Sequence, residues 1–288
     1  MIKSIVIFSV LPLFCLAQGL DSITNNLHNK KNIIKFADHL FCQKDYLRAA
    51  EEYLRIDEYH RSDELNFKIA LSFSTIGEYL KAETIFDKIN SNSEYFQHSK
   101  LEMLKILFLE GRFRELKEKT FADNQITNSV VASIGNKIFH YSFLKSEENI
   151  LSVDEFIQPF DQEERDKLTE LYQLKINPPY TDPLLSSILS AIIPGAGKFY
   201  TGEITDGIFA LISTGLFSFL AYDNFKAGHD FRGWIFTGLA AGFYSGNIYG
   251  SYASAQIYNA RFKYEFNLNL DSFIKSKNYF IPEYDFCK

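Results

Sequence analysis

Two long uncharged stretches near the C-terminal end constrain this chain more than any other feature of its sequence. Residues 207–222 and residues 233–260 contain no charged side chain, and one short polar loop, residues 223–232, joins them. As a helix, residues 207–222 would extend about 24 Å, and adding residues 204–206 approaches the ~30 Å hydrocarbon core of a bilayer. We therefore expect a transmembrane helical hairpin. The alternative is a pair of helices buried in a soluble core.

Glycines within the second stretch recur every four residues. In a water-soluble helix each would cost roughly 1 kcal/mol relative to alanine. In lipid, four-residue spacing places them on one helix face, where they allow another helix to approach closely. We expect this face to serve helix packing and to offer a route to a homo-oligomer. It consists of Gly238, Gly242, Gly246 and Gly250.

A glycine-rich segment, PGAGKFYTG at residues 194–202, precedes the first stretch. Its GAGK core is similar to a phosphate-binding loop, but that loop also requires a glycine at position 192 and a hydroxyl at position 199. Ile192 and Phe199 occupy those positions. We therefore expect no nucleotide, and instead a turn at the membrane surface that follows a short interfacial or re-entrant helix at about residues 184–197.

The same turn carries a family resemblance. Its residues match a P-G-x-G-x-x-Y-x-G pattern at Pro194, Gly195, Gly197, Tyr200 and Gly202. Over about residues 184–258 the chain thus resembles a family of small bacterial membrane domains with two spanning helices. The resemblance implies an architecture and no established enzymatic activity.

The N-terminal segment has the features of a secretory signal peptide, residues 1–17. Lys3 precedes an apolar stretch, and Cys15 and Ala17 provide small residues for cleavage after Ala17. An uncleaved anchor helix is the alternative, whereas lipidation of Cys15 is disfavoured by Phe14. Cleavage leaves Cys42 and Cys287, which we do not expect to form a disulfide framework, and we expect Cys42 to be a small core residue.

The first half of the chain contains an internal repeat. Residues 44–56 and 77–89 align without a gap at an offset of 33, and residues 109–121 form a weaker third copy. Small residues would let paired helices approach, and aromatic residues would fill the space beneath the next pair. The residues with these roles are Ala37, Tyr46, Ala49, Tyr53, Ala70, Tyr79, Ala82 and Phe86.

This pattern resembles tetratricopeptide repeats over about residues 30–123. The resemblance implies a scaffold that binds protein partners, with a packing platform that has no dedicated ligand as the alternative. Lys35, His39, Lys68 and Ser72 lie on the first helices of their pairs and are candidates for partner contacts; the alternative for them is solvated surface.

The predicted fold is all-α, with one exception in the tail. Residues 262–274 alternate apolar and polar side chains, which predicts a β-strand, with an amphipathic surface segment as the alternative. The expected organisation is a signal peptide (1–17), a linker (18–31), a helical repeat domain (32–175), a proline-rich linker (176–183), a membrane domain (184–260) and a C-terminal tail (261–288).

Charge and residue patterns argue against several functions. The net charge of -6 disfavours nucleic acid as a partner. The six histidines are scattered, and none has metal-ligand spacing with another histidine or cysteine. We see no catalytic constellation and expect no metal and no cofactor.

The expected function is therefore a non-enzymatic scaffold, anchored in the inner membrane of a bacterial envelope. Its repeats would bind protein partners in the periplasm, and its hairpin would contact the lipid bilayer. Two spans would return the C-terminus to the side of the repeats and leave Lys226 and Arg232 in the cytoplasm. The rival functions are a pore or transporter subunit assembled through the glycine face, and an enzyme that uses the helical domain.

Overall fold

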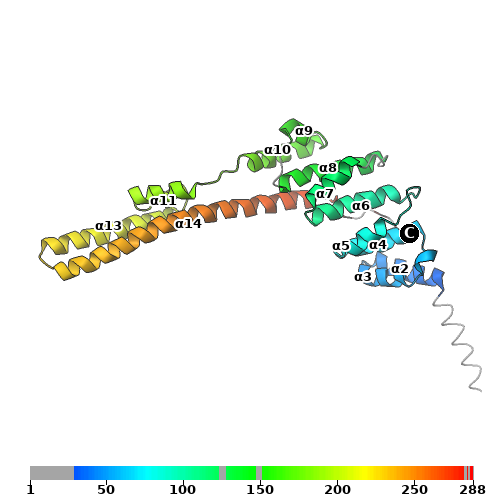
Figure 1. The fold of residues 1–288 in the computed structure, drawn as a ribbon, viewed down its shortest axis with the longest axis horizontal. Helices are drawn as coiled ribbons and strands as arrows, with labels where there is room; N and C mark the ends of the chain where they lie inside the picture. The colour runs from blue at the N-terminus through cyan, green and yellow to red at the C-terminus, as the bar shows by residue number, and fades with distance from the viewer. Residues whose placement is uncertain (1–28, 123–127, 147–150, 282–283, 285, 288) are drawn as a thin grey trace, which may run out of the picture. The chain divides into compact units, whose positions relative to one another are not determined.

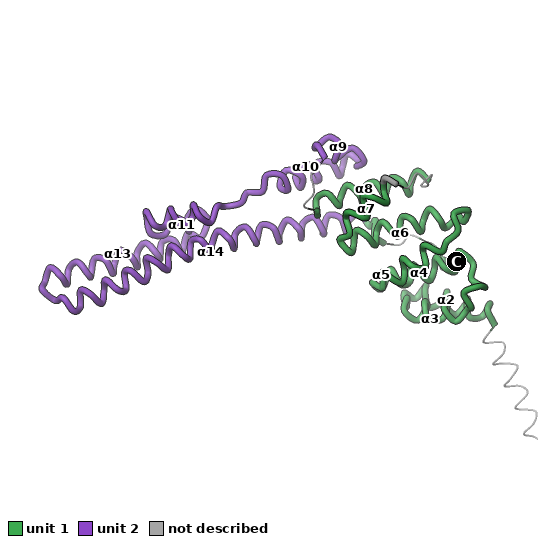
Figure 2. The backbone as a smooth tube through the Cα atoms, in the orientation of Figure 1, with its two compact units in different colours: residues 1–150, 278–288 green, residues 151–277 purple. Residues whose placement is uncertain are grey.

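The computed structural model describes residues 29–122, 128–146, 151–281, 284, 286 and 287, and all its regular elements there are helices (Figure 1). The predicted all-α class is therefore confirmed for the described residues. The chain divides into two compact units, one of residues 1–150 and 278–288 and the other of residues 151–277 (Figure 2). The predicted signal peptide lies outside the described residues.

The first unit is built from successive helix pairs. Helices joined by a tight turn contact each other, and the second helix of one pair contacts the first helix of the next. In chain order the helices are α2 (Lys30–Cys42), α3 (Tyr46–Leu54), the short 3₁₀ helix η1 (Glu58–His60), α4 (Asp63–Thr75), α5 (Tyr79–Phe86), α6 (Phe96–Leu109), α7 (Phe113–Ala122) and α8 (Ser129–Lys145).

The turn within each pair has the same backbone conformation. Gly77 and Gly111 end the first helices of the second and third pairs with φ angles of 82° and 71°. Lys44 holds the equivalent position in the first pair with a φ of 63°, which is unusual for a residue with a side chain. The side chains of Asp45 and Ser62 cap α3 and α4 by accepting hydrogen bonds from backbone N–H groups.

The residues expected to pack between repeats lie in or against one apolar cluster. The four alanines expected from the repeat, Ala37, Ala49, Ala70 and Ala82, have no exposed surface, and Tyr53 and Phe86 are also buried. Tyr46 and Tyr79 are partly buried against the same cluster. In the third copy the buried Leu116 stands where the first two copies have alanine.

The second unit contains the remaining helices. Helices α11 and α13 both pack along α14, while α10 contacts α9 and the distal part of α14. Their bounds are α9 (Val153–Ile157), α10 (Gln162–Ile176), α11 (Pro183–Ile192), α12 (Ala196–Tyr200), α13 (Ile204–Lys226) and α14 (Asp230–Ser276).

The predicted strand at residues 262–274 is wrong, because this segment is the last part of α14. That helix has 47 residues and is about 70 Å long. Phe266, Leu270 and Ile274 are buried at four-residue intervals, whereas Tyr264 and Leu268 are exposed. The same sequence also places apolar residues at helical spacing, and these are the residues that are buried in α14.

Two observed boundaries differ from the expected organisation. Helices α9 and α10 belong to the second unit, although the expected repeat domain extended to residue 175. Helix α14 runs through the expected boundary at residue 260 without a break.

One helix of the described residues is long and apolar enough to cross a membrane, α13. Helix α14 does not meet the same criterion. Its uncharged part is rich in glycine, serine and tyrosine, which are less apolar than the leucine, isoleucine and phenylalanine of α13.

Candidate functional site

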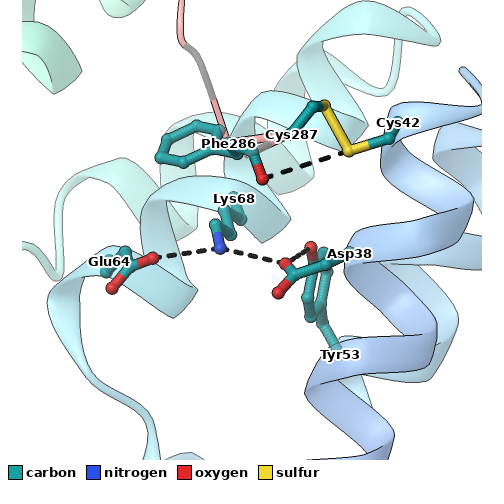
Figure 3. Close-up of a disulfide and its surroundings, with 7 residues drawn as sticks. All are labelled: Asp38, Cys42, Tyr53, Glu64, Lys68, Phe286 and Cys287. Carbon is teal, nitrogen blue, oxygen red and sulfur yellow. Dashed lines mark hydrogen bonds and ion pairs between the residues drawn. A yellow bond between two sulfur atoms is a disulfide. The ribbon is translucent and has the colours of Figure 1, made fainter.

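A disulfide joins the two ends of the first unit. Cys42, at the end of α2, is bonded to Cys287, with 5.6 Å between their Cα atoms and 245 positions between them in sequence (Figure 3). The expectations that these cysteines stay unpaired and that Cys42 is a core residue are therefore wrong, and Cys42 is exposed. The sequence signal for this pairing was the even number of cysteines, Cys42 and Cys287, that follow the predicted signal peptide.

The segment before Cys287 packs its aromatic side chains onto the first helices of the repeats. The ring of Tyr284 lies 4.8 Å from that of Phe67 and 5.3 Å from that of His98, between ring centroids. The ring of Phe286 lies 5.8 Å from that of Phe41. We call the surface of α2, α4, α6 and α8 that contacts residues 279, 280, 284, 286 and 287 the tail-binding face.

A buried ion pair lies at the centre of the tail-binding face. Glu102 and Lys105 of α6 are both buried, and Lys105 Nζ donates a hydrogen bond of 2.6 Å to Oε1 of Glu102. The Tyr284 hydroxyl donates a second bond of 3.0 Å to the same oxygen. Burial raises the pKa of the Tyr284 phenol above its ordinary value, and the charge and hydrogen bond of Glu102 raise it further.

A second charged network lies beside Phe286 (Figure 3). Lys68 Nζ, on α4, is 2.9 Å from Oδ1 of Asp38 and 3.0 Å from Oε1 of Glu64, and it lies 4.9 Å from the centre of the Phe286 ring. Burial lowers the pKa of Lys68, but hydrogen bonds to the two carboxylates outweigh burial and the net shift is upward. The network holds a cation against the aromatic ring, which is a favourable arrangement.

The same carboxylate of this network also holds a tyrosine of the repeat core. The Tyr53 hydroxyl donates a hydrogen bond of 2.5 Å to Oδ1 of Asp38. Burial, followed by the hydrogen bond and charge of Asp38, raises the pKa of Tyr53. The tail-binding face is thereby linked to the packing between the first two repeats.

The tail-binding face extends to α6 and α8 through Tyr279 and Phe280. Lys137 Nζ donates a hydrogen bond of 2.9 Å to the Tyr279 hydroxyl. The ring of Phe280 lies 5.2 Å from that of Phe108. Four aromatic side chains of the C-terminal segment are therefore held by four different helices of the unit.

The four residues proposed from sequence for partner contacts have different environments. Lys68 contacts the C-terminal segment through Phe286. Ser72 is buried and donates its hydroxyl hydrogen to the carbonyl of Lys68. Lys35 and His39 lie exposed on α2. Sequence reasoning missed Phe67, His98, Glu102 and Lys137, because their role depends on contact with the C-terminal segment, which local spacing does not predict.

The turn motif of the second unit lies between α11 and α13. Gly195 has a φ of 90°, and a Cβ built on it would overlap the backbone of Gly207. A Cβ on Gly197 would overlap the Ser186 carbonyl. Pro194 follows the end of α11, the Tyr200 hydroxyl accepts a hydrogen bond from the Asp182 N–H at 3.2 Å, and Gly202 turns the chain with a φ of 82°.

A buried polar network holds this turn against α14. The Ser186 hydroxyl donates to the Ser251 carbonyl at 2.8 Å, and the hydroxyls of Ser190 and Ser251 lie 2.6 Å apart. Asn247 accepts from the Gly195 N–H at 3.2 Å and donates to the Ser190 carbonyl at 3.3 Å. The four side chains of this network, Ser186, Ser190, Asn247 and Ser251, are all buried.

The outside of the same helices is apolar. Large apolar side chains are exposed along α11, α13 and the first half of α14, including Ile192, Phe209, Phe219, Trp234 and Tyr249. A soluble protein buries such residues and exposes its polar ones, whereas here serine and asparagine lie inside. This distribution is typical of a protein whose surroundings are lipid.

The glycine row of α14 lies mostly in open space within the chain. A Cβ on Gly238, Gly242 or Gly246 would meet no atom within 4 Å, while one on Gly250 would meet only the Lys198 side chain. The three open glycines line a groove of about 400 Å³ beside Phe209 of α13. Helix α13 therefore packs against α14 beside this row and leaves the glycines uncovered.

Among the described residues, no group of three histidine, cysteine, aspartate or glutamate side chains is arranged to hold a metal ion. Comparison with protein-family models, with curated proteins and with solved structures finds no match to this chain.

Proposed function

We propose that this protein is a membrane-anchored scaffold of a bacterial envelope, whose tetratricopeptide-like repeats bind protein partners outside the cytoplasm. The disulfide is the observation that carries the proposal. Cys42 precedes the apolar helices and Cys287 follows them, so a single crossing would separate the two cysteines. The disulfide therefore favours two crossings, by α13 and α14.

Other features support the same arrangement. Disulfides persist in oxidising compartments such as the periplasm, in agreement with an N-terminal signal peptide. Lys226, the last residue of α13, and Arg232, in the first turn of α14, flank the turn between these helices, as expected of a turn that faces the cytoplasm. The polar network within α11–α14, surrounded by exposed apolar side chains, is suited to lipid.

A pair of cysteine substitutions tests this topology in cells. Tyr59 is 95% exposed in the repeats, and Lys226 is exposed at the end of α13. In spheroplasts, a membrane-impermeant maleimide should label Tyr59→Cys but label Lys226→Cys only after permeabilisation. Labelling of both residues before permeabilisation, or a mature chain that is a compact monomer without detergent, would contradict the proposal.

Partner binding needs its own measurement. After crosslinking in cells, partners should co-purify with the intact protein and be lost when residues 30–123 are deleted. The deletion variant keeps α11–α14 and should remain in the membrane fraction, which controls for mislocalisation. Recovery of the same partners without the repeats would count against a scaffold role.

The open glycine row favours a second candidate, a pore or transporter subunit assembled from several copies. Gly238, Gly242 and Gly246 leave a groove that a helix of another copy can enter. Gly242→Leu should then abolish both an oligomer detected by crosslinking and a solute flux into vesicles. A monomeric wild-type protein in detergent and in crosslinked membranes would exclude this candidate.

A further inference from the structure

The C-terminal segment occupies the tail-binding face as a bound peptide would. Residues 284, 286 and 287 have no regular secondary structure, and their contacts come from side chains. Tyr284 places its ring against Phe67 and its hydroxyl on Glu102, while Phe286 lies under Lys68. Tyr284 and Phe286, two positions apart, thus occupy neighbouring positions on two helices, α4 and α6.

The charged groups of the tail-binding face are also suited to binding such a peptide. Glu102 and Lys105 form a buried pair, and the Tyr284 phenol donates a further hydrogen bond to the Glu102 oxygen that Lys105 binds. Buried charges are costly unless such bonds are made, so the pair favours a ligand that brings a hydroxyl. Lys68 places a cation beside the ring of Phe286, and Lys137 donates a hydrogen bond to the phenol of Tyr279.

We infer that the tail-binding face is the surface through which the repeats recognise protein partners, and that Tyr279, Phe280, Tyr284 and Phe286 of the C-terminal segment are its built-in competitor. The partner it fits is a peptide with a tyrosine and a second aromatic residue two positions later, as in Tyr284 and Phe286. This inference rests on the proposed scaffold function and adds where the partner binds and what controls access.

The Cys42–Cys287 disulfide controls access to the tail-binding face. Both cysteines are exposed, so a small dithiol or a thioredoxin-like protein dithiol can reach them. Its first thiolate attacks one sulfur, breaks the Cys42–Cys287 bond and forms a mixed disulfide. That first step releases the other cysteine as a thiolate, and the second thiol of the reductant then displaces the cysteine held in the mixed disulfide, so the chain gains two thiol protons and two electrons while the dithiol becomes a disulfide. The reduced tail competes with the partner only through its side-chain contacts.

Peptide binding to the full-length protein in detergent tests this inference. The probe is a fluorescent peptide with the sequence of residues 278–287, NYFIPEYDFC, with serine in place of the cysteine. The oxidised protein should not bind it measurably. Reduction with dithiothreitol should increase the affinity at least tenfold, and the Cys42→Ser, Cys287→Ser variant should bind without reductant.

Two further variants fix the site and guard against misfolding. A chain that ends at Ser276 should bind the peptide more tightly than the reduced full-length protein, because it has no tethered competitor. A peptide with alanine at the positions of Tyr284 and Phe286 should lose binding to every form. Circular dichroism of each protein checks that the helices are intact.

Several outcomes would overturn the inference. Equal binding to oxidised and reduced protein would exclude control by the disulfide, and failure of the folded Ser276-terminated chain to bind would exclude a peptide site. Dimers of reduced protein that exchange tails would identify a second copy as the occupant instead. If peptide binding fails in this way but partners still require residues 30–123 for co-purification, the proposed scaffold function stands. Only the assignment of the binding site to the tail-binding face is then wrong.

Discussion

Tyr284 and Glu102 are joined by a hydrogen bond of 3.0 Å although 182 positions separate them in sequence. Between them the chain forms α11, α13 and α14 and then returns to the repeats. The carboxylate also accepts the hydrogen bond from Lys105. This contact within the first unit is therefore made by a buried charge of α6 and a phenol of the C-terminal segment.

Removing this bond should loosen the C-terminal segment. We expect Tyr284→Phe to lower the free energy of unfolding of the repeat domain by about 1–3 kcal/mol, the usual range for a hydrogen bond to a charged group. A double-mutant cycle with Glu102→Gln, measured by chemical denaturation in detergent, should give a coupling energy in that range. Tyr59→Phe is the matched control, because Tyr59 is 95% exposed, and should change nothing. Additive effects of the two substitutions would contradict the contact.

Alkaline pH should weaken the same contact. Burial, then the charge and hydrogen bond of Glu102, raise the pKa of Tyr284 above that of a free tyrosine, about 10. The contribution to stability is therefore complete below about pH 10 and is lost as pH rises from there toward the raised pKa of the folded state. Denaturation midpoints measured from pH 8 to pH 11.5 should fall above pH 10.

The control for this pH dependence is the Tyr284→Phe variant, which should fall less steeply. The comparison is needed because Tyr53 and Lys68 also have raised pKa values and lose their contributions at alkaline pH. The groups that face Tyr284 are Glu102 and the ring of His98. Identical curves for the two proteins would show that Tyr284 does not titrate in a buried environment.

How far the sequence predicts this fold depends on the range of each interaction. The repeats follow from local spacing, because Ala49 and Ala82 occupy equivalent helical positions and both are buried. The disulfide does not follow, because it depends on where α14 delivers the chain after many intervening residues. The segment around Phe266 and Leu270 fits both a strand and a helix, and its place at the end of the continuous helix α14 could not be read from its own alternation.

The two kinds of glycine in the second unit should respond differently to substitution. A Cβ on Gly197 would overlap the backbone of Ser186, which has no flexible atom to move aside. We expect Gly197→Ala to lower the stability of α11–α14 by about 3 kcal/mol, at the upper end for overpacking. Gly242→Ala is the matched control, since its Cβ would enter open space, and it should change stability of the monomer by less than about 0.5 kcal/mol. Thermal unfolding in detergent followed by circular dichroism measures both, and equal effects would contradict the predicted packing.

Asn247 should matter for the attachment of the turn to α14. Its side chain pairs with the Gly195 N–H and the Ser190 carbonyl, and replacement by leucine leaves both groups without this partner in a buried position. We expect Asn247→Leu to cost about 1–3 kcal/mol. Ser245→Ala is the control, because Ser245 is exposed and bonds only to carbonyls of its own helix. Hydrogen exchange should become faster at Gly195 in the leucine variant and stay unchanged in the control. Unchanged exchange in both variants would contradict a holding role for Asn247.

Lys44 is the position in the first repeat where the chain departs from its own pattern. Its φ of 63° is a conformation that the second and third repeats assign to Gly77 and Gly111. A side chain at this φ destabilises the folded state by roughly 1 kcal/mol. Replacement by glycine removes this cost, but it also raises the entropy of the unfolded chain, which offsets part of the gain. We expect Lys44→Gly to stabilise the repeat domain by about 0.5 kcal/mol, and Gly77→Lys to destabilise it by about 1 kcal/mol. Denaturation midpoints of the two variants against the native protein measure this difference. Because the end of α2 also carries Cys42, both variants are compared with the disulfide intact. Opposite signs for the two changes in stability would show that both turns have the same left-handed geometry.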